Sequence, residues 1–208
     1  MVVFSGYWKV DNNPKASAKK GHIDHLKKKK IDLLFCDKKY GIINNEVIID
    51  LPVKDLVKDF TGECYTKFGQ KINAETMTDL CKIWCSKILL FKEAMDLYPK
   101  ENEFVWVDCV SETNFDKIIN VKSDNIVINK YTKMYKNPFN GKVAIDFKNL
   151  KVHLLAQVIK INRTNIISII EKYIHTLKWV NETYNVYDEE VVLTHMYHKY
   201  PDLFEIVN

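Results

Sequence analysis

The stretch Glu-Phe-Val-Trp-Val-Asp-Cys, residues 103–109, decides the fold, because a run of strand-forming residues ends abruptly on a carboxylate. Phe104 to Val107 are β-branched or aromatic without polar alternation, which is typical of a strand covered on both faces in an α/β sheet. An ionised Asp108 would be costly inside such a core, whereas ligands of open α/β sheets bind outside the carboxyl ends of the strands. Asp108 is therefore a candidate site residue, although an Asp that caps a turn at Ser111 to Asn114 would produce the same sequence.

Apolar runs on both sides of this strand predict a mixed α/β sheet. Further strands are predicted at Val2–Ser5, Ile31–Phe35, Val47–Leu51, Ile126–Ile128 and Val143–Ile145. Apolar residues at three- and four-residue steps predict one helix from about Met77 to Tyr98, which Pro99 ends. A second helix is predicted after Thr164, and a third from near Asp188 to a point before Pro201.

Length and composition predict one folded domain. The chain has 208 residues, of which 47% are apolar, and this content argues against disorder. The net charge of +4 creates no dominating field, and the five cysteines, odd in number and widely spaced, are expected to be reduced. No stretch approaches the roughly 20 apolar residues that span a bilayer. A cytoplasmic protein is expected.

The run Lys27 to Lys30 could contact a lipid surface or an anionic polymer, but it lacks the interleaved aromatic residues that stack on bases. Contact with a membrane is therefore expected to be at most peripheral, and no nucleic-acid partner is expected. A basic nucleic-acid-binding domain remains the alternative that this run allows.

Acidic residues open the last predicted helix, at Asp188-Glu189-Glu190. Carboxylates in a first turn are stabilised by the positive end of the helix dipole, so helix capping alone would explain them. Asp188 or Glu189 could instead serve as a general base, provided that it faces the same cleft as Asp108. Lys87 lies on the long helix that leads into the Asp108 strand and could approach a phosphate, while a solvated lysine is the alternative.

Histidines and cysteines point less clearly to a site. His195 and His198 lie three residues apart on the last helix without a third metal ligand one turn away, so a metal site is not predicted there. His195, two turns from Asp188, stays a possible site residue. Cys81 and Cys85 are interpreted as core packing. No G-x-G-x-x-G or Walker sequence is present, so a nucleotide would need another mode of binding, such as a metal ion that neutralises a diphosphate.

Several segments together resemble a known family. Ile83-Trp84-Cys85-Ser86-Lys87, then Glu93-Ala94, then Phe104-Val105-Trp106-Val107-Asp108 resemble the W-x-S-K, E-A and F-V-W-x-D pattern of HtrL/YibB-like glycosyltransferases. Phe4-Ser5-Gly6-Tyr7-Trp8 is similar to the opening strand and turn of that family, and the segments 187–193 and 200–204 are similar to its D-E closing helix and P-x-L-F end. These pieces span nearly the whole chain.

The resemblance implies a GT-A-type fold with a mixed, mostly parallel sheet flanked by helices. It divides the single domain 1–208 into a donor-binding half, 1–110, and an acceptor half, 111–208. A divalent metal, manganese or magnesium, would bridge the donor diphosphate to the strand-end acid, which Asp108 matches. The family's residues that border the nucleotide or lie near the donor are matched by Ser5, Gly6, Tyr7, Trp8, Lys87 and Trp106, and those that face the acceptor by Asp188 or Glu189.

The implied activity is metal-assisted transfer of a hexosyl or pentosyl group from a nucleoside-diphosphate sugar to a hydroxyl of a glycan or glycoprotein. One departure bears on it. The D-x-D pair of such folds is replaced here by Asp108-Cys109-Val110, so the metal would have one protein carboxylate. The alternative is a catalytically idle α/β module that binds a nucleotide or a glycan without transferring sugar.

Overall fold

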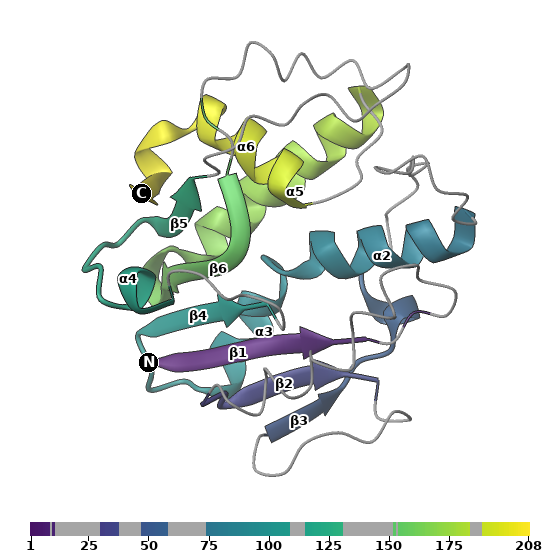
Figure 1. Cartoon of the computed structure of the whole chain (residues 1–208), viewed down its shortest axis with the longest axis horizontal. Coiled ribbons are helices and arrows are strands. Elements are labelled where there is room, and N and C mark those ends of the chain that lie inside the picture. Colours follow the sequence, from purple (N-terminus) through teal and green to yellow (C-terminus); the bar gives the residue numbers. More distant parts are fainter. Residues whose placement is uncertain are drawn as a thin grey trace.

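A seven-stranded sheet organises the molecule (Figure 1). The structure is a computed structural model that describes residues 1–8, 10, 30–37, 47–57, 74–108, 115–130, 152, 154–183 and 189–208. The strands of these residues are β1 (Val2–Tyr7), β2 (Leu33–Cys36), β3 (Val47–Asp50), β4 (Glu103–Val107), β5 (Ile126–Lys130), β6 (Leu154–Asn162) and β7 (Phe204–Val207). The α-helices are α2 (Ala74–Ser86), α3 (Leu90–Leu97), α4 (Phe115–Ile119), α5 (Ile166–Thr183) and α6 (Glu189–Lys199). Short 3₁₀ turns lie at Val53–Asp55, Arg163–Asn165 and Pro201–Leu203.

The sheet is mixed and mostly parallel, as predicted. The strand order is β3-β2-β1-β4-β6-β5-β7, and β6 is antiparallel to both of its neighbours, β4 and β5, while the other pairs are parallel. Because β6 runs in the opposite direction, its middle residue Val158 lies opposite Val107 at the carboxyl end of β4, and its first half continues past that end. The chain leaves β1 and β4 at the same edge, since Phe4 pairs with Trp106 in parallel register.

Helices cover the sheet on both faces. One face carries the main core, in which side chains of α2, α3, α5 and α6 pack on alternate residues of the central strands, such as Phe4 and Trp106. The intervening residues, such as Val3 and Val105, face a smaller cluster under α4. Phe4 holds the centre of the main core, with its ring edge-on to Trp106 at 5.6 Å and to Phe91 at 4.8 Å. Burial on both faces explains why β1 and β4 have no polar alternation.

Most of the predicted strands are confirmed within a few residues at their ends. The exceptions are Val143–Ile145, which lies outside the described residues, and β7, for which no strand was predicted. Most of the apolar segment from Val152 to Ile161, for which the sequence predicts no particular element, forms β6. No helix in the described part of the chain is long and apolar enough to cross a membrane.

The prediction of one continuous helix from Met77 to Tyr98 is wrong, because α2 ends at Ser86 and α3 begins at Leu90. Between them the backbone N–H groups bond three residues back instead of four: Lys87 donates to Trp84 (3.3 Å) and Phe91 to Ile88 (3.3 Å). The Ser86 hydroxyl donates to the carbonyl of Ile83 at 2.8 Å, and such local bonds compete with helix geometry. The apolar spacing continues through the break, so periodicity alone could not reveal it.

A buried lysine joins α4 to the sheet. Lys160 of β6 is only 2% exposed, and its ammonium donates to the carbonyls of Ile119 (3.1 Å) and Val121 (2.9 Å) at the end of α4. It also forms an ion pair with Glu103 on β4 at 2.6 Å. Cations are favourable at the carboxyl end of a helix, where carbonyls lack partners within the helix.

We predict that Lys160→Met lowers the free energy of unfolding by about 2 to 3 kcal/mol, because the carbonyls beyond α4 and the Glu103 carboxylate lose their buried partner. Urea unfolding at neutral pH measures the change. Lys130→Met is the matched control, since Lys130 is exposed at the end of the neighbouring strand β5. Equal stabilities of the two variants would contradict this role for Lys160.

Candidate active site

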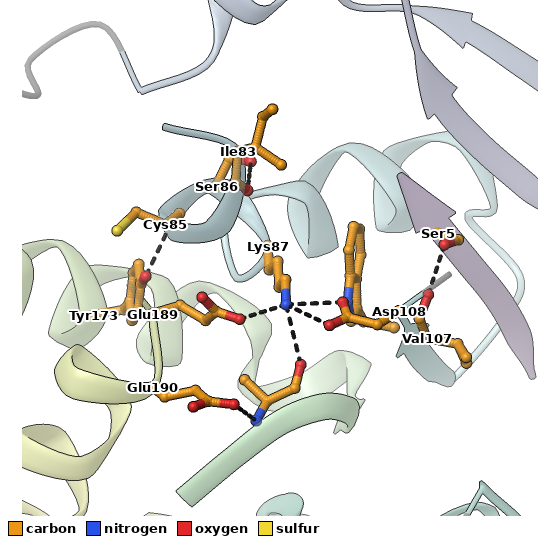
Figure 2. A network of polar contacts seen from close by, with 12 residues as sticks. Ser5, Ile83, Cys85, Ser86, Lys87, Val107, Asp108, Tyr173, Glu189 and Glu190 are labelled. Carbon is orange, nitrogen blue, oxygen red and sulfur yellow. Dashed lines mark hydrogen bonds and ion pairs between the residues drawn. The ribbon is translucent and has the colours of Figure 1, made fainter. Parts of the chain in front are cut away.

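Three separate segments of the chain meet at the carboxyl edge of β4 (Figure 2). Asp108 is the first residue after β4, and its backbone N–H donates to the carbonyl of Gln157 on β6 at 2.7 Å. Lys87 lies in the break between α2 and α3, and Glu189 is the first residue of α6. The break turns Lys87 toward the sheet, where its ammonium lies between the two acids.

The ammonium of Lys87 is held by both carboxylates. Its Nζ lies 2.8 Å from Oδ1 and 2.9 Å from Oδ2 of Asp108, and it donates to Oε1 of Glu189. The carbonyl of Ala156 on β6 lies at 3.4 Å. Lys87 is only 4% exposed, so the alternative of a solvated lysine is wrong.

The surroundings keep Lys87 charged. Burial by itself would lower the pKa of Lys87, but the attraction of Asp108 and then of Glu189 outweighs it and raises the pKa above its usual value. Among the residues that the structure describes, two carboxylates thus face one ammonium in the group of Lys87, Asp108 and Glu189, called here the Lys87 cluster.

The two acids differ in access. The side chain of Asp108 is 21% exposed, whereas that of Glu189 is 4% exposed. Trp106 also fixes Asp108, since its indole Nε1 donates to Oδ1 at 2.7 Å. Asp108 is thus the acid that a ligand at the edge of the sheet can reach, and Glu189 lies behind it.

Neighbouring contacts fix the elements that carry the cluster. Glu190 accepts the backbone N–H of Ala156 at 3.3 Å, so the start of α6 is joined to β6. The hydroxyl of Tyr173 on α5 donates to the carbonyl of Cys85 at 3.0 Å, near the end of α2. Sequence reasoning missed these supports, because Ala156 and Cys85 act through backbone atoms that no residue type reveals.

The residues of the opening strand build the wall beside the site. Ser5 is fully buried, and its hydroxyl donates to the carbonyl of Val107 at 2.6 Å, so in Figure 2 it points at β4 and not at Lys87. A Cβ added to Gly6 would lie 2.2 Å from the ring of Trp8 and 2.9 Å from that of Trp106. Trp8 is 6% exposed and donates its indole N–H to the carbonyl of Leu51 at 2.7 Å. Tyr7, which packs beside a small cluster on β2, is partly exposed.

A divalent metal fits this site only in one way. Within the described ranges, no three His, Cys, Asp or Glu side chains lie together as a metal-binding group. Magnesium, however, is commonly bound by one or two carboxylates together with substrate phosphates and water. Asp108, whose side chain is partly exposed, fits as a single carboxylate ligand, with the diphosphate of a donor supplying the others.

The remaining predicted residues lie apart from the cluster or outside the described residues. Asp188, Cys109 and Val110 are among the latter. His195 is not brought to Lys87, and packs its ring against Trp179 of α5 at 5.3 Å. Cys81 and Cys85 are fully buried in the main core, as interpreted from the sequence.

The chain has an α/β fold with a mixed, mostly parallel sheet flanked by helices. Among the solved structures to which it is similar is the "Crystal structure of a glycosyltransferase involved in the glycosylation of the major capsid of PBCV-1", with a TM-score of 0.47 and 10% identity. The match covers 100% of this chain and 80% of that chain. No family model and no curated protein matches the sequence.

We predict that Lys87→Met lowers the free energy of unfolding by about 3 kcal/mol at pH 7, because two carboxylates remain in a buried site without their cation. Protonation of the carboxyls removes the uncompensated negative charge, so the loss is largest at neutral pH and shrinks toward pH 4. Chemical unfolding at several pH values measures it. Lys178→Met, at an exposed position on α5, is the control. A loss that does not depend on pH would contradict the charge cluster.

We predict that Gly6→Ala lowers the free energy of unfolding by about 1 to 3 kcal/mol, because the added methyl group overlaps the ring of Trp8. Near-ultraviolet circular dichroism should change with it. In the background of Trp8→Leu the same substitution should cost less, and the double-mutant cycle isolates the Gly6–Trp8 contact. Additive effects would mean that Trp8 does not occupy the space above Gly6.

Proposed function

We propose that the protein is a glycosyltransferase, which moves a hexosyl or pentosyl group from a nucleoside-diphosphate sugar to a hydroxyl of a glycan or glycoprotein. One observation carries the proposal. Lys87, Asp108 and Glu189 come from three separate segments of the pattern that resembles HtrL/YibB-like glycosyltransferases, and their charged groups are in direct contact. Segments that resemble one family in sequence and converge in space are expected of a shared site.

The position of the cluster supports the same proposal. It lies at the carboxyl end of β4, beside β1, which is the edge where open α/β sheets bind ligands. Lys87 and Asp108 belong to residues 1–110, the proposed donor half, while Ala156 and Glu189 belong to residues 111–208, the proposed acceptor half. A donor and an acceptor held by these halves would therefore meet at Asp108.

For the donor, we propose that Asp108 holds a divalent metal, manganese or magnesium. When bound, the metal would offset the charge that builds on the leaving diphosphate. Trp106 and Lys87 orient the Asp108 carboxylate, and Lys87 adds a fixed positive charge near the donor. Of the opening strand, Tyr7 would border the nucleotide directly, and Ser5, Gly6 and Trp8 would shape that border from beneath.

For the acceptor, we propose that Asp188 is the general base and that Glu189 is a positioning residue for Lys87. Glu189 is buried and its carboxylate contacts the ammonium of Lys87, whereas a general base must reach the acceptor hydroxyl. In the reaction the bond between the anomeric carbon and the diphosphate oxygen breaks, and its electron pair stays on the diphosphate. The acceptor oxygen bonds to the anomeric carbon and gives its proton to the base.

The test is release of free sugar and nucleoside diphosphate from a panel of nucleotide sugars, with and without manganese. We predict turnover of one donor by the native protein and a loss of about 100-fold in kcat for Asp108→Asn, because the acid that holds the diphosphate through the metal is gone. Asp202→Asn, at an exposed position after α6, should keep full activity.

Two other outcomes would overturn the proposal. If a nucleotide sugar raises the melting temperature of the protein but is not turned over, the protein is an idle binding module. If none of the panel is turned over or raises the melting temperature, the Lys87 cluster is structural, and the likeness to glycosyltransferases is one of fold only.

A further inference from the structure

A cavity of about 360 Å³ lies between α5 and α6, lined by residues that do not belong to the Lys87 cluster. The lining residues are His175, Thr176 and Trp179 of α5 and His195, His198 and Lys199 of α6. His195 lies six residues after Glu189 on α6, a distance of about 9 Å at 1.5 Å per residue. The cavity therefore lies farther along the same helix, α6, whose first residue, Glu189, belongs to the Lys87 cluster, and the two sites are separate.

Trp179 provides the cavity with a broad apolar surface. It is 43% exposed, and its indole meets the ring of His195 at 5.3 Å with an angle of 72° between the ring planes. This edge-to-face contact limits the orientations of the indole. Exposed apolar area of this size is unfavourable in water, at roughly 25 cal/mol per Å², so a ligand that covers the indole is favoured.

Polar groups surround this apolar surface. The imidazoles of His175, His195 and His198 can each donate and accept hydrogen bonds. The hydroxyl of Thr176 donates to the carbonyl of Lys172 at 2.8 Å, so toward a ligand it offers acceptor capacity. A flat apolar surface beside several hydrogen-bonding groups is the usual composition of a small-molecule site.

Most of the residues that line the cavity carry no fixed charge, which favours an uncharged ligand. Burial and then the proximity of His198 lower the pKa of His195, so that imidazole is neutral at neutral pH. Lys199 is exposed and lies over the ring of Tyr200 at 5.2 Å, and it supplies the fixed positive charge among the lining residues. Across the described part of the chain no three potential ligands gather to bind a metal.

We propose that this cavity binds a neutral saccharide. A pyranose ring has an apolar face of C–H bonds and a rim of hydroxyls, and these match the indole of Trp179 and the imidazoles around it. The identity of the saccharide rests on the proposed function: in a glycosyltransferase it would be a distal part of the acceptor glycan. The binding of a saccharide in this cavity does not depend on that function.

The test is calorimetry and saturation-transfer NMR with cellobiose, lactose, maltose and N,N′-diacetylchitobiose at millimolar concentrations. We expect at least one disaccharide to bind the native protein, and Trp179→Ala to weaken it by about tenfold or more, because the stacking surface is lost. Trp179→Phe should retain most of the affinity. Ile174→Ala is the matched control, since Ile174 is another exposed apolar residue of α5 that does not line the cavity.

The proposal is overturned if none of the four disaccharides binds, if Trp179→Ala binds as well as the native protein, or if inorganic phosphate binds and competes with the sugar. Melting temperatures of the variants check that each one is folded. Disaccharide binding without turnover of any nucleotide sugar would leave the saccharide site standing and remove the glycosyltransferase proposal. Turnover of a nucleotide sugar without binding of any disaccharide would support the glycosyltransferase proposal and remove the saccharide site.

Discussion

A buried ammonium between two carboxylates joins the end of β4 to the start of α6. Lys87 contacts Asp108 at the end of β4 and Glu189 at the start of α6, while the carbonyl of Ala156 on β6 lies nearby. An unpaired charge at 4% exposure would be far too costly to keep, so the positions of all three elements are constrained together. The same contacts hold the partly exposed Asp108 at the end of β4. One interaction thus fixes the positions of these elements and forms the proposed site.

The break between α2 and α3 makes this interaction possible. In a continuous helix the direction of the Lys87 side chain would follow from 3.6 residues per turn. Here the backbone N–H groups of Lys87 and Phe91 bond to carbonyls three residues back, and this tighter turn directs Lys87 toward the sheet. The hydroxyl of Ser86 supports the break from inside α2. The structure therefore explains the Ser-Lys pair of the W-x-S-K segment: the serine favours the turn, and the lysine side chain is buried.

The two ends of α6 differ in character. At its start, Glu189 and Glu190 contact Lys87 and the backbone of Ala156, and both contacts are polar. Farther along, His195 and its neighbours face α5 across a cavity in which the broad surface is the indole of Trp179. Under the two proposals, the charged centre at the start of α6 would hold a diphosphate through a metal, and the aromatic cavity farther along would hold an uncharged sugar ring.

The sequence alone determined the α/β class and the buried strand at β4, because burial on both faces of a strand leaves an uninterrupted apolar run, and it marked the terminal acid as a candidate site residue. It also marked Lys87 and Glu189, but it left a solvated lysine and a helix cap as the commoner explanations. Only the tertiary structure brought these residues together, since Lys87 and Glu189 are separated by 102 positions and no local pattern encodes such a contact. The break between α2 and α3, the strand β7 and the supporting backbone atoms of Ala156 and Cys85 were likewise decided by packing. The periodicity of a sequence shows which face of a helix or strand is apolar. The features just named depend instead on which other elements pack against that face.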